Sequence, residues 1–362
     1  MKTGRMILIF IIIAAAAITG FYSNFKEMPT EAIGIYDIFN CSGDSDCMDQ
    51  KAEQLLQIKN QRQLLAELDE LGKTDNAILI QCHPITHAIG RMTYKLASNV
   101  GEAFQKCDHT CHSGCFHGVM ERVFLGDNTD EHITPQMIRE KTPDVCESFA
   151  QGLYGNIRFQ CLHGLGHAVV FFSDYNLTES LKLCDLLATE WDQRSCYGGA
   201  FMENVVAVNK SKRYVSDDPH FPCNAIDDKY RQDCYLMQTS RMLEMGLSYE
   251  QMAKECEKAA DYRNVCMQSI GRDASNDARK DPRSVSICTS LSDSDNRFCI
   301  AGLVYAVADN SWDGRYAFPY CDNINESYTQ YCYETTIRHL KHSLFINQSH
   351  HHRQLQDLFL LL

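Results

Sequence analysis

Residues 249–274 read YEQMAKECEKAADYRNVCMQSIGRDA, and this stretch contains the unit that decides the fold. Cys256 and Cys266 flank the polar segment AADYRN, and residues of helical period follow the second cysteine. A helical period interrupted by a polar segment predicts two helices joined by a turn. One cysteine late in the first helix and one early in the second face each other across that turn. The unit therefore predicts a helical hairpin closed by one disulfide.

The same unit recurs along the chain. Its cysteine pairs are Cys146/Cys161, Cys184/Cys196, Cys223/Cys234, Cys256/Cys266, Cys288/Cys299 and Cys321/Cys332. The second members of successive pairs lie 35, 38, 32, 33 and 33 residues apart, a spacing typical of helical-hairpin arrays. The sequence therefore predicts an all-α solenoid of helical hairpins with a period of about 33–38 residues, each stapled by a disulfide.

The remaining six cysteines lie nearer the N-terminus and are less regular. Cys107 and Cys115 extend the repeat by analogy, whereas Cys82 has Cys41, Cys47 and Cys111 as alternative partners. Zinc is the alternative to disulfides, but structural zinc sites favour thiols about two to four residues apart, closer than most pairs here. A free Cys111 beside a histidine is a further alternative, as a nucleophile.

Proline positions add expected helix starts. Thr134-Pro135, Thr142-Pro143 and Asp281-Pro282 each place a capping residue before a proline, and each is expected to open a helix.

Composition and the chain start indicate the compartment. Lys2 and Arg5 precede an apolar run, which predicts a signal peptide or an uncleaved membrane anchor at residues 1–23. Eighteen cysteines in 362 residues favour an oxidising compartment. Five N-x-S/T sites agree with export of a glycoprotein: Asn40, Asn176, Asn209, Asn325 and Asn347. The expected location is extracytoplasmic, either secreted or anchored to the outer face of the cytoplasmic membrane.

The histidines divide the exported part into regions. Residues 24–75 are expected to be a linker and a first helix, residues 76–206 His-rich metal-binding hairpins, residues 207–345 structural stapled repeats, and residues 346–362 a tail. Eight of the 14 histidines lie between positions 83 and 167. The chemistry is therefore expected in the N-terminal half.

Four successive helices carry polar side chains four residues apart. The phrases are His83-Pro-Ile-Thr-His87, His117-Gly-Val-Met-Glu121, His163-Gly-Leu-Gly-His167 and Gly199-Ala-Phe-Met-Glu203. Residues four apart project from one helix face, and stacked hairpins bring equivalent faces together. The expected ligands are His83, His87, His117, Glu121, His163, His167 and Glu203, with His112 or His109 as extras. This set suits one or two transition-metal ions, namely iron, copper, zinc or manganese.

Glycines within these helices also point to close approach of a ligand or another helix. Gly118, Gly164, Gly166 and Gly199 stand at helix-interior positions, where glycine lowers helix stability by up to about 1 kcal/mol each. In layout, though not in sequence, the His and Glu phrases resemble the HEAT-repeat di-iron hydroxylases that modify deoxyhypusine. That resemblance implies metal ligands supplied by successive hairpins. The present chain departs from it in its export, its cysteines and its His/His phrases.

These observations predict an exported metal-binding protein, a mono- or dinuclear oxidoreductase or hydrolase. In that interpretation Glu121 binds metal, and Glu203 is either a ligand or a general base. The alternatives are a metal or haem binding module without turnover, and an interaction scaffold with structural histidines. The net charge of −13 argues against nucleic acid as a partner. The expected partners are the membrane, through the N-terminal segment only, and an exported protein or redox partner.

Overall fold

The computed structural model describes residues 33–108, 110–125, 134–149, 155–207, 210–280, 286–309 and 314–345. All regular secondary structure within these ranges is helical, as the sequence predicts. The expected signal peptide or anchor and the expected tail lie outside the described residues. Of the helices that are described, none is both long and apolar enough to cross a membrane.

The N-terminal region holds more helix than expected. Three helices, α2 (Ile35–Phe39), α3 (Ser45–Leu56) and α4 (Gln61–Thr74), pack against α5 (Asn76–Lys95). The start of α4 has a local cause, because the side chains of Asn60 and Gln63 each accept a backbone N–H of the other. The residues expected to be a linker and one helix thus form a small helical layer beside α5.

From α6 onward, most units consist of a short helix followed by a long one. The short–long pairs are α6 (Val100–Lys106) with α7 (Thr110–Leu125), α8 (Pro135–Lys141) with α9 (Gly155–Phe172), α10 (Leu177–Cys184) with α11 (Glu190–Val206), α13 (Tyr249–Cys256) with α14 (Arg263–Lys280), and α16 (Ala317–Asn323) with α17 (Glu326–Phe345). Two more long helices are α12 (Asp228–Glu244) and α15 (Asp293–Asp309).

In the units that contain α12 and α15, the segment before the long helix is not an α-helix. Turns precede α12, where Pro219 and Pro222 interrupt any helix, and a 3-10 turn (Ile287–Thr289) precedes α15. One expected helix start is also wrong. Thr134 caps α8 as expected, but Thr142 ends α8, because Pro143 directly after it cannot continue a helix. Asp281 lies outside the described residues.

All eighteen cysteines are paired in nine disulfides. They are Cys41–Cys47, Cys82–Cys111, Cys107–Cys115, Cys146–Cys161, Cys184–Cys196, Cys223–Cys234, Cys256–Cys266, Cys288–Cys299 and Cys321–Cys332. The last seven are the pairs that spacing and analogy indicate. Cys82 joins Cys111 on the next long helix, so Cys111 is not a free nucleophile.

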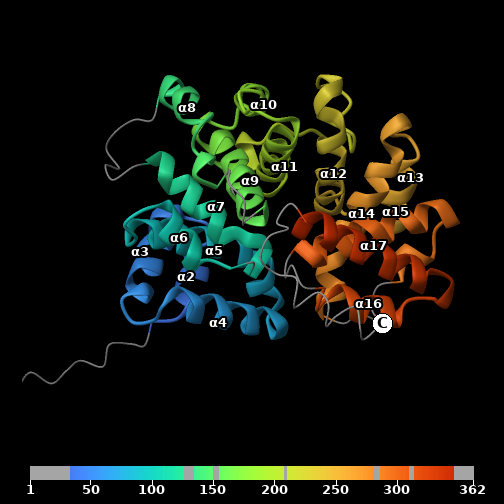
Figure 1. Cartoon of the computed structure of the whole chain (residues 1–362), viewed down its shortest axis with the longest axis horizontal. Helices are drawn as coiled ribbons and strands as arrows, with labels where there is room; N and C mark the ends of the chain where they lie inside the picture. The colour runs from blue at the N-terminus through green and yellow to red at the C-terminus, as the bar shows by residue number, and fades with distance from the viewer. Residues whose placement is uncertain are drawn as a thin grey trace, which may run out of the picture.

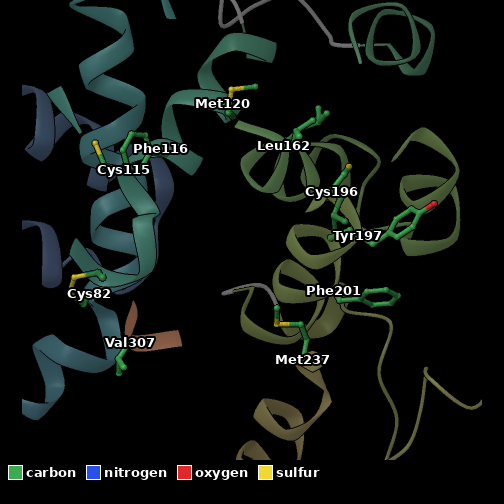
Figure 2. Packing of buried hydrophobic residues seen from close by; sticks show 14 of the residues in the cluster. Cys82, Cys115, Phe116, Met120, Leu162, Cys196, Tyr197, Phe201, Met237 and Val307 are labelled. Atoms are coloured by element: carbon green, nitrogen blue, oxygen red, sulfur yellow. A yellow bond between two sulfur atoms is a disulfide. The ribbon is translucent and has the colours of Figure 1, made fainter. Parts of the chain in front are cut away.

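The long helices pack side by side in chain order, from α5 through α17. Helix α17 also contacts α9, so the row of helices curves back on itself (Figure 1). Buried cysteine, aromatic and methionine side chains fill the space between neighbouring helices, as Cys115, Phe116 and Met120 do along α7 (Figure 2). The inner faces of the long helices therefore meet near the middle of the molecule.

Close backbone contact joins three pairs of these helices. A Cβ atom on Gly118 would lie 2.0 Å from the carbonyl oxygen of His87, and one on Gly199 would lie 1.9 Å from that of His163. In the α14–α15 pair, Gly302 meets the carbonyl oxygen of Gln268 in the same way, at 1.9 Å. Of the two expected reasons for these helical glycines, the structure shows the close approach of another helix.

Candidate metal centre

Four histidines from three neighbouring helices form one group. His83 and His87 come from α5, His117 from α7 and His167 from α9, and one ring nitrogen of each lies within 4.8 Å of those of the others. The i, i+4 spacing puts both α5 side chains on one face. The contact between Gly118 and the His87 carbonyl brings α7 against that face, so His117 enters the same space. The group is buried, apart from the half-buried His83.

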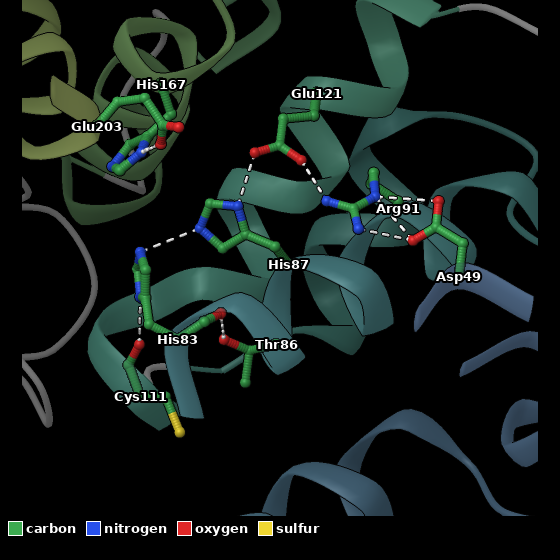
Figure 3. A network of polar contacts seen from close by, with 9 residues as sticks. All are labelled: Asp49, His83, Thr86, His87, Arg91, Cys111, Glu121, His167 and Glu203. Atoms are coloured by element: carbon green, nitrogen blue, oxygen red, sulfur yellow. Dashed lines mark hydrogen bonds and ion pairs between the residues drawn. The ribbon is translucent and has the colours of Figure 1, made fainter. Parts of the chain in front are cut away.

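Three of the four imidazoles use Nδ1 for a partner outside the group (Figure 3). His83 Nδ1 donates to the backbone carbonyl of Cys111 at 2.7 Å. His87 Nδ1 lies 2.6 Å from Oε1 of Glu121, and His167 Nδ1 lies 2.7 Å from Oε2 of Glu203. The Cys111 carbonyl and the ionised Glu121 place a proton on Nδ1 of His83 and His87 and leave Nε2 of each as a bare lone pair. Glu203 does the same for His167 in its ionised form. This is the usual arrangement of metal-ligating histidines.

The Glu121 carboxylate is itself held in place. Its Oε2 accepts from Nη1 of Arg91 at 2.6 Å (Figure 3). Arg91 also makes a bidentate pair with Asp49 on α3, in which Nη2 donates to Oδ1 at 2.7 Å and Nε donates to Oδ2 at 3.1 Å. Burial raises the pKa of Glu121, but the nearby His87 and Arg91 outweigh it and bring the pKa to about 2. Glu121 is therefore an ionised acceptor that fixes the orientation of His87.

The facing nitrogens lack complementary hydrogens. Nε2 of His83 and Nε2 of His87 lie 3.0 Å apart, although both Nδ1 atoms donate elsewhere. Nε2 of His167 and both ring nitrogens of His117 are buried without a hydrogen-bond partner among the described residues. Buried polar atoms are nearly always satisfied, so these nitrogens are available to bind a cation or to accept a hydrogen bond.

Burial keeps the imidazoles in the neutral form that ligation requires. It lowers the pKa of both His117 and His167 well below the ordinary value, and the neighbouring histidines add to this. Burial also raises the pKa of Glu203 to about 8, and the charge of Glu121 acts in the same direction. In contrast to Glu121, Glu203 forms no ion pair with a Lys or Arg of the described chain. The site thus combines neutral ligands with a carboxyl group that lacks a compensating cation.

The other expected ligands occupy different places. Glu121 and Glu203 hydrogen-bond to His87 and His167 and lie outside the group of four. His163 stacks against Phe159, and its Nε2 lies 3.4 Å from the Met202 sulfur. The side chain of His112 and the whole of His109 lie outside the described residues.

Helix packing explains the separate position of His163. The glycine contacts place His163 opposite Gly199, as His87 is placed opposite Gly118. His163 is thus the packing equivalent of His87, whereas counting from the preceding cysteine aligns it with His117. Alignment by the preceding cysteine and alignment by the glycine contact therefore give different equivalents for His163. For this reason cysteine spacing alone does not predict whether the His163 ring reaches the group of four.

Sequence reasoning missed the outer partners of the site. Asp49 and Arg91 are 42 residues apart in the sequence. The partner of His83 is a backbone carbonyl, that of Cys111, which no side-chain pattern can reveal. The only signal in the sequence is that Arg91 lies four residues after His87, one further turn along the same helix face.

Two cavities reach the group. One, of about 620 Å³, is lined by His83, His87, Glu121 and Glu203, among others. The other, of about 340 Å³, is lined by His117 and His163. Small molecules therefore have space on two sides of the four histidines.

Comparison with known proteins gives no assignment to set beside this geometry. No protein-family model matches the chain, and neither curated proteins nor solved structures include a match to it.

Proposed function

We propose that the chain is an exported metal-binding protein. It holds one transition-metal ion on Nε2 of His83, His87 and His167 and on one ring nitrogen of His117. The observation that carries this proposal is the 3.0 Å approach of two Nε2 atoms whose Nδ1 atoms both donate elsewhere. Two lone pairs at that distance repel each other unless a cation lies beside both.

A shared proton is the simplest competing explanation. A proton between His83 and His87 satisfies those two nitrogens and leaves His117 and His167 without partners. A metal ion satisfies four nitrogens at once. Metal–imidazole bonds are about 2.0–2.1 Å long, so nitrogens on one ion are at most ~4.2 Å apart, and the observed 4.8 Å limit needs only small shifts.

The donor set narrows the choice of metal. Imidazole suits zinc, copper and iron, whereas manganese prefers carboxylate and water oxygens. Because Glu121 is engaged by Arg91 and Glu203 by His167, the inner ligands are nitrogens only. Zinc, copper or iron therefore fits better than manganese. One group of four ligands favours a mononuclear site.

Turnover at the metal is the finer part of the proposal. The larger cavity adjoins His83, His87 and Glu203, so water can approach the ion from that side. In an oxidoreductase or hydrolase of this design, Glu203 is placed to accept or donate a proton. A metal reservoir without turnover is the alternative, and a water on the metal that exchanges with solvent separates the two.

The proposal also covers the compartment in which the protein folds and the arrangement of its helical units. Nine disulfides indicate folding in an oxidising, extracytoplasmic compartment. We infer that the stapled short–long units form one curved solenoid that presents the metal centre to an exported protein or redox partner.

The deciding experiment measures metal in the full chain, produced under oxidising conditions, by plasma mass spectrometry. We expect one ion per chain in the wild type and loss of that ion in His167→Ala. The matched control is His163→Ala, on the same helix but outside the group, which keeps the ion. A metal-free wild-type protein, or equal metal content in the two variants, contradicts the proposal.

A further inference from the structure

The smaller cavity exposes mostly apolar surface. It is lined by long helices from both halves of the chain, including α9, α14, α15 and α17. Its apolar lining is Phe159, Met202, Leu236, Met237, Tyr305 and Ala306, and the uncharged polar side chains on its wall are Ser113, Gln160 and Gln268. An engineered apolar cavity of about 150 Å³ is enough to bind benzene. The volume here, about 340 Å³, accommodates a two-ring molecule.

The charged groups on this wall are already neutralised within the protein. The Arg272 guanidinium pairs with Asp273 at 2.8 Å, and it donates to the Ser240 hydroxyl at 2.7 Å and to the Leu236 carbonyl at 3.0 Å. Asp309 pairs with His339 at 2.6 Å. An anion or cation entering the cavity would lose its hydration without gaining an opposite charge. The cavity therefore favours a neutral ligand.

One end of the cavity is polar. His117 is 1% exposed and has no hydrogen-bond partner on either ring nitrogen within the described part of the chain. His163, 7% exposed, lies beside it with ring centroids 5.0 Å apart. His117 also belongs to the four-histidine group. A ligand that fills the apolar part of the cavity thus ends next to the metal centre.

We propose that this cavity binds a neutral, mostly apolar small molecule that directs a single polar atom toward His117. The inference rests on the proposed metal centre only for the role of that polar atom, because the metal would be its partner. The shape and polarity of the cavity do not depend on the metal. The proposal thus names the substrate class for the metal centre: a small aromatic or aliphatic alcohol, phenol or carbonyl compound.

The test uses 2-naphthol as the probe and the full, metal-loaded chain as the receptor. Binding is followed by probe fluorescence, and naphthalene-2-sulfonate serves as an anionic probe with the same ring system. We expect 2-naphthol to bind at least tenfold more tightly than the sulfonate. Ala306→Trp fills the cavity and should weaken 2-naphthol binding at least tenfold. Ile80→Trp is the matched control, because Ile80 is 67% exposed and lines the larger cavity, and it should change affinity less than twofold.

Ala306→Leu provides a smaller change if the tryptophan variant does not fold, and it should weaken binding by an intermediate factor. Affinity for 2-naphthol that is unchanged in a folded Ala306 variant, or equally weakened by Ile80→Trp, overturns the proposal. So does equal affinity for the sulfonate. Metal content is measured on the same samples. Probe binding that depends on Ala306 in a protein without metal would refute the metal centre and leave the cavity assignment standing.

Discussion

Three of the four histidines in the candidate centre have a partner that holds the second ring nitrogen. The i, i+4 phrases predicted which side chains share a helix face, and His83, His87, His117 and His167 do meet. The partners were less predictable. Glu121 was expected as a ligand, but the buried Arg91 binds its outer oxygen. That contact depends on how α3, α5 and α7 pack, which no local pattern encodes.

At the residue scale, Glu121→Gln tests the outer partners. The amide keeps the shape but cannot ensure that Nδ1 of His87 carries the proton, and it leaves Arg91 short of one charge. Loss of such a partner typically lowers metal affinity about 10–100-fold. Competition with a chromophoric chelator measures it. Glu179→Gln, an exposed position paired only with Lys182, should leave affinity unchanged, and equal affinities in all three proteins would contradict the assigned role.

A second prediction at this scale concerns pH. Burial lowers the pKa of His339, but the Asp309 carboxylate outweighs it and raises that pKa above the ordinary value. The pair therefore stabilises the fold fully below about pH 6.5 and loses its effect as pH rises through the folded-state pKa. In urea unfolding, the stability difference between wild type and His339→Gln should shrink from about pH 6 to about pH 9. A constant or growing difference would contradict this, and Asp309→Asn should reduce the difference at the lower pH.

At the scale of elements, cysteine spacing and helical period predicted the long helices and their order well. They did not predict which helices make backbone contact. Gly118 and Gly199 signalled close approach, but only the structure shows that the neighbour is a carbonyl of the preceding long helix. The short arms were predicted less well where prolines such as Pro222 replace a helix by turns.

Substituting Gly118 tests whether helix contact positions the ligands. Gly118→Ala places a methyl group 2.0 Å from the His87 carbonyl, so α5 and α7 must separate. We expect a loss of about 1–3 kcal/mol in the free energy of unfolding, together with weaker metal binding. Gly72→Ala is the control, because its methyl group would meet only Leu79 at 3.5 Å. That change should stabilise α4 by up to about 1 kcal/mol. Urea unfolding that ranks the two variants in the opposite order would contradict the packing.

At the scale of the whole molecule, the disulfides reinforce one continuous buried core that extends from Ile35 to Cys332. Most close a short hairpin, whereas Cys82–Cys111 spans 29 residues and joins two long helices at the metal centre. Spacing predicted the regular pairs, because each is local. Cys82 had several candidate partners in the sequence, and only the packing of α5 on α7 selects Cys111.

Removing this bridge should affect both stability and metal. In the chain-entropy model a disulfide contributes about 3 kcal/mol for a 15-residue loop and more for longer ones. The Cys82→Ala/Cys111→Ala variant should lose stability and bind metal more weakly, because the Cys111 carbonyl holds His83. The Cys321→Ala/Cys332→Ala variant, whose bridge spans 11 residues, should lose stability but keep its metal. Thermal unfolding and metal analysis of both proteins provide the comparison, and metal loss in the second variant alone would contradict it.

The repeated glycine contact makes the backbone joint separable from the side chains beside it. Gly118, Gly199 and Gly302 mark the same joint in three helix pairs, with His87, His163 and Gln268 at the equivalent position. The third pair forms the joint with a glutamine at that position, so the joint does not depend on an imidazole there. The histidines can therefore be exchanged without removing the contact that holds the helices together.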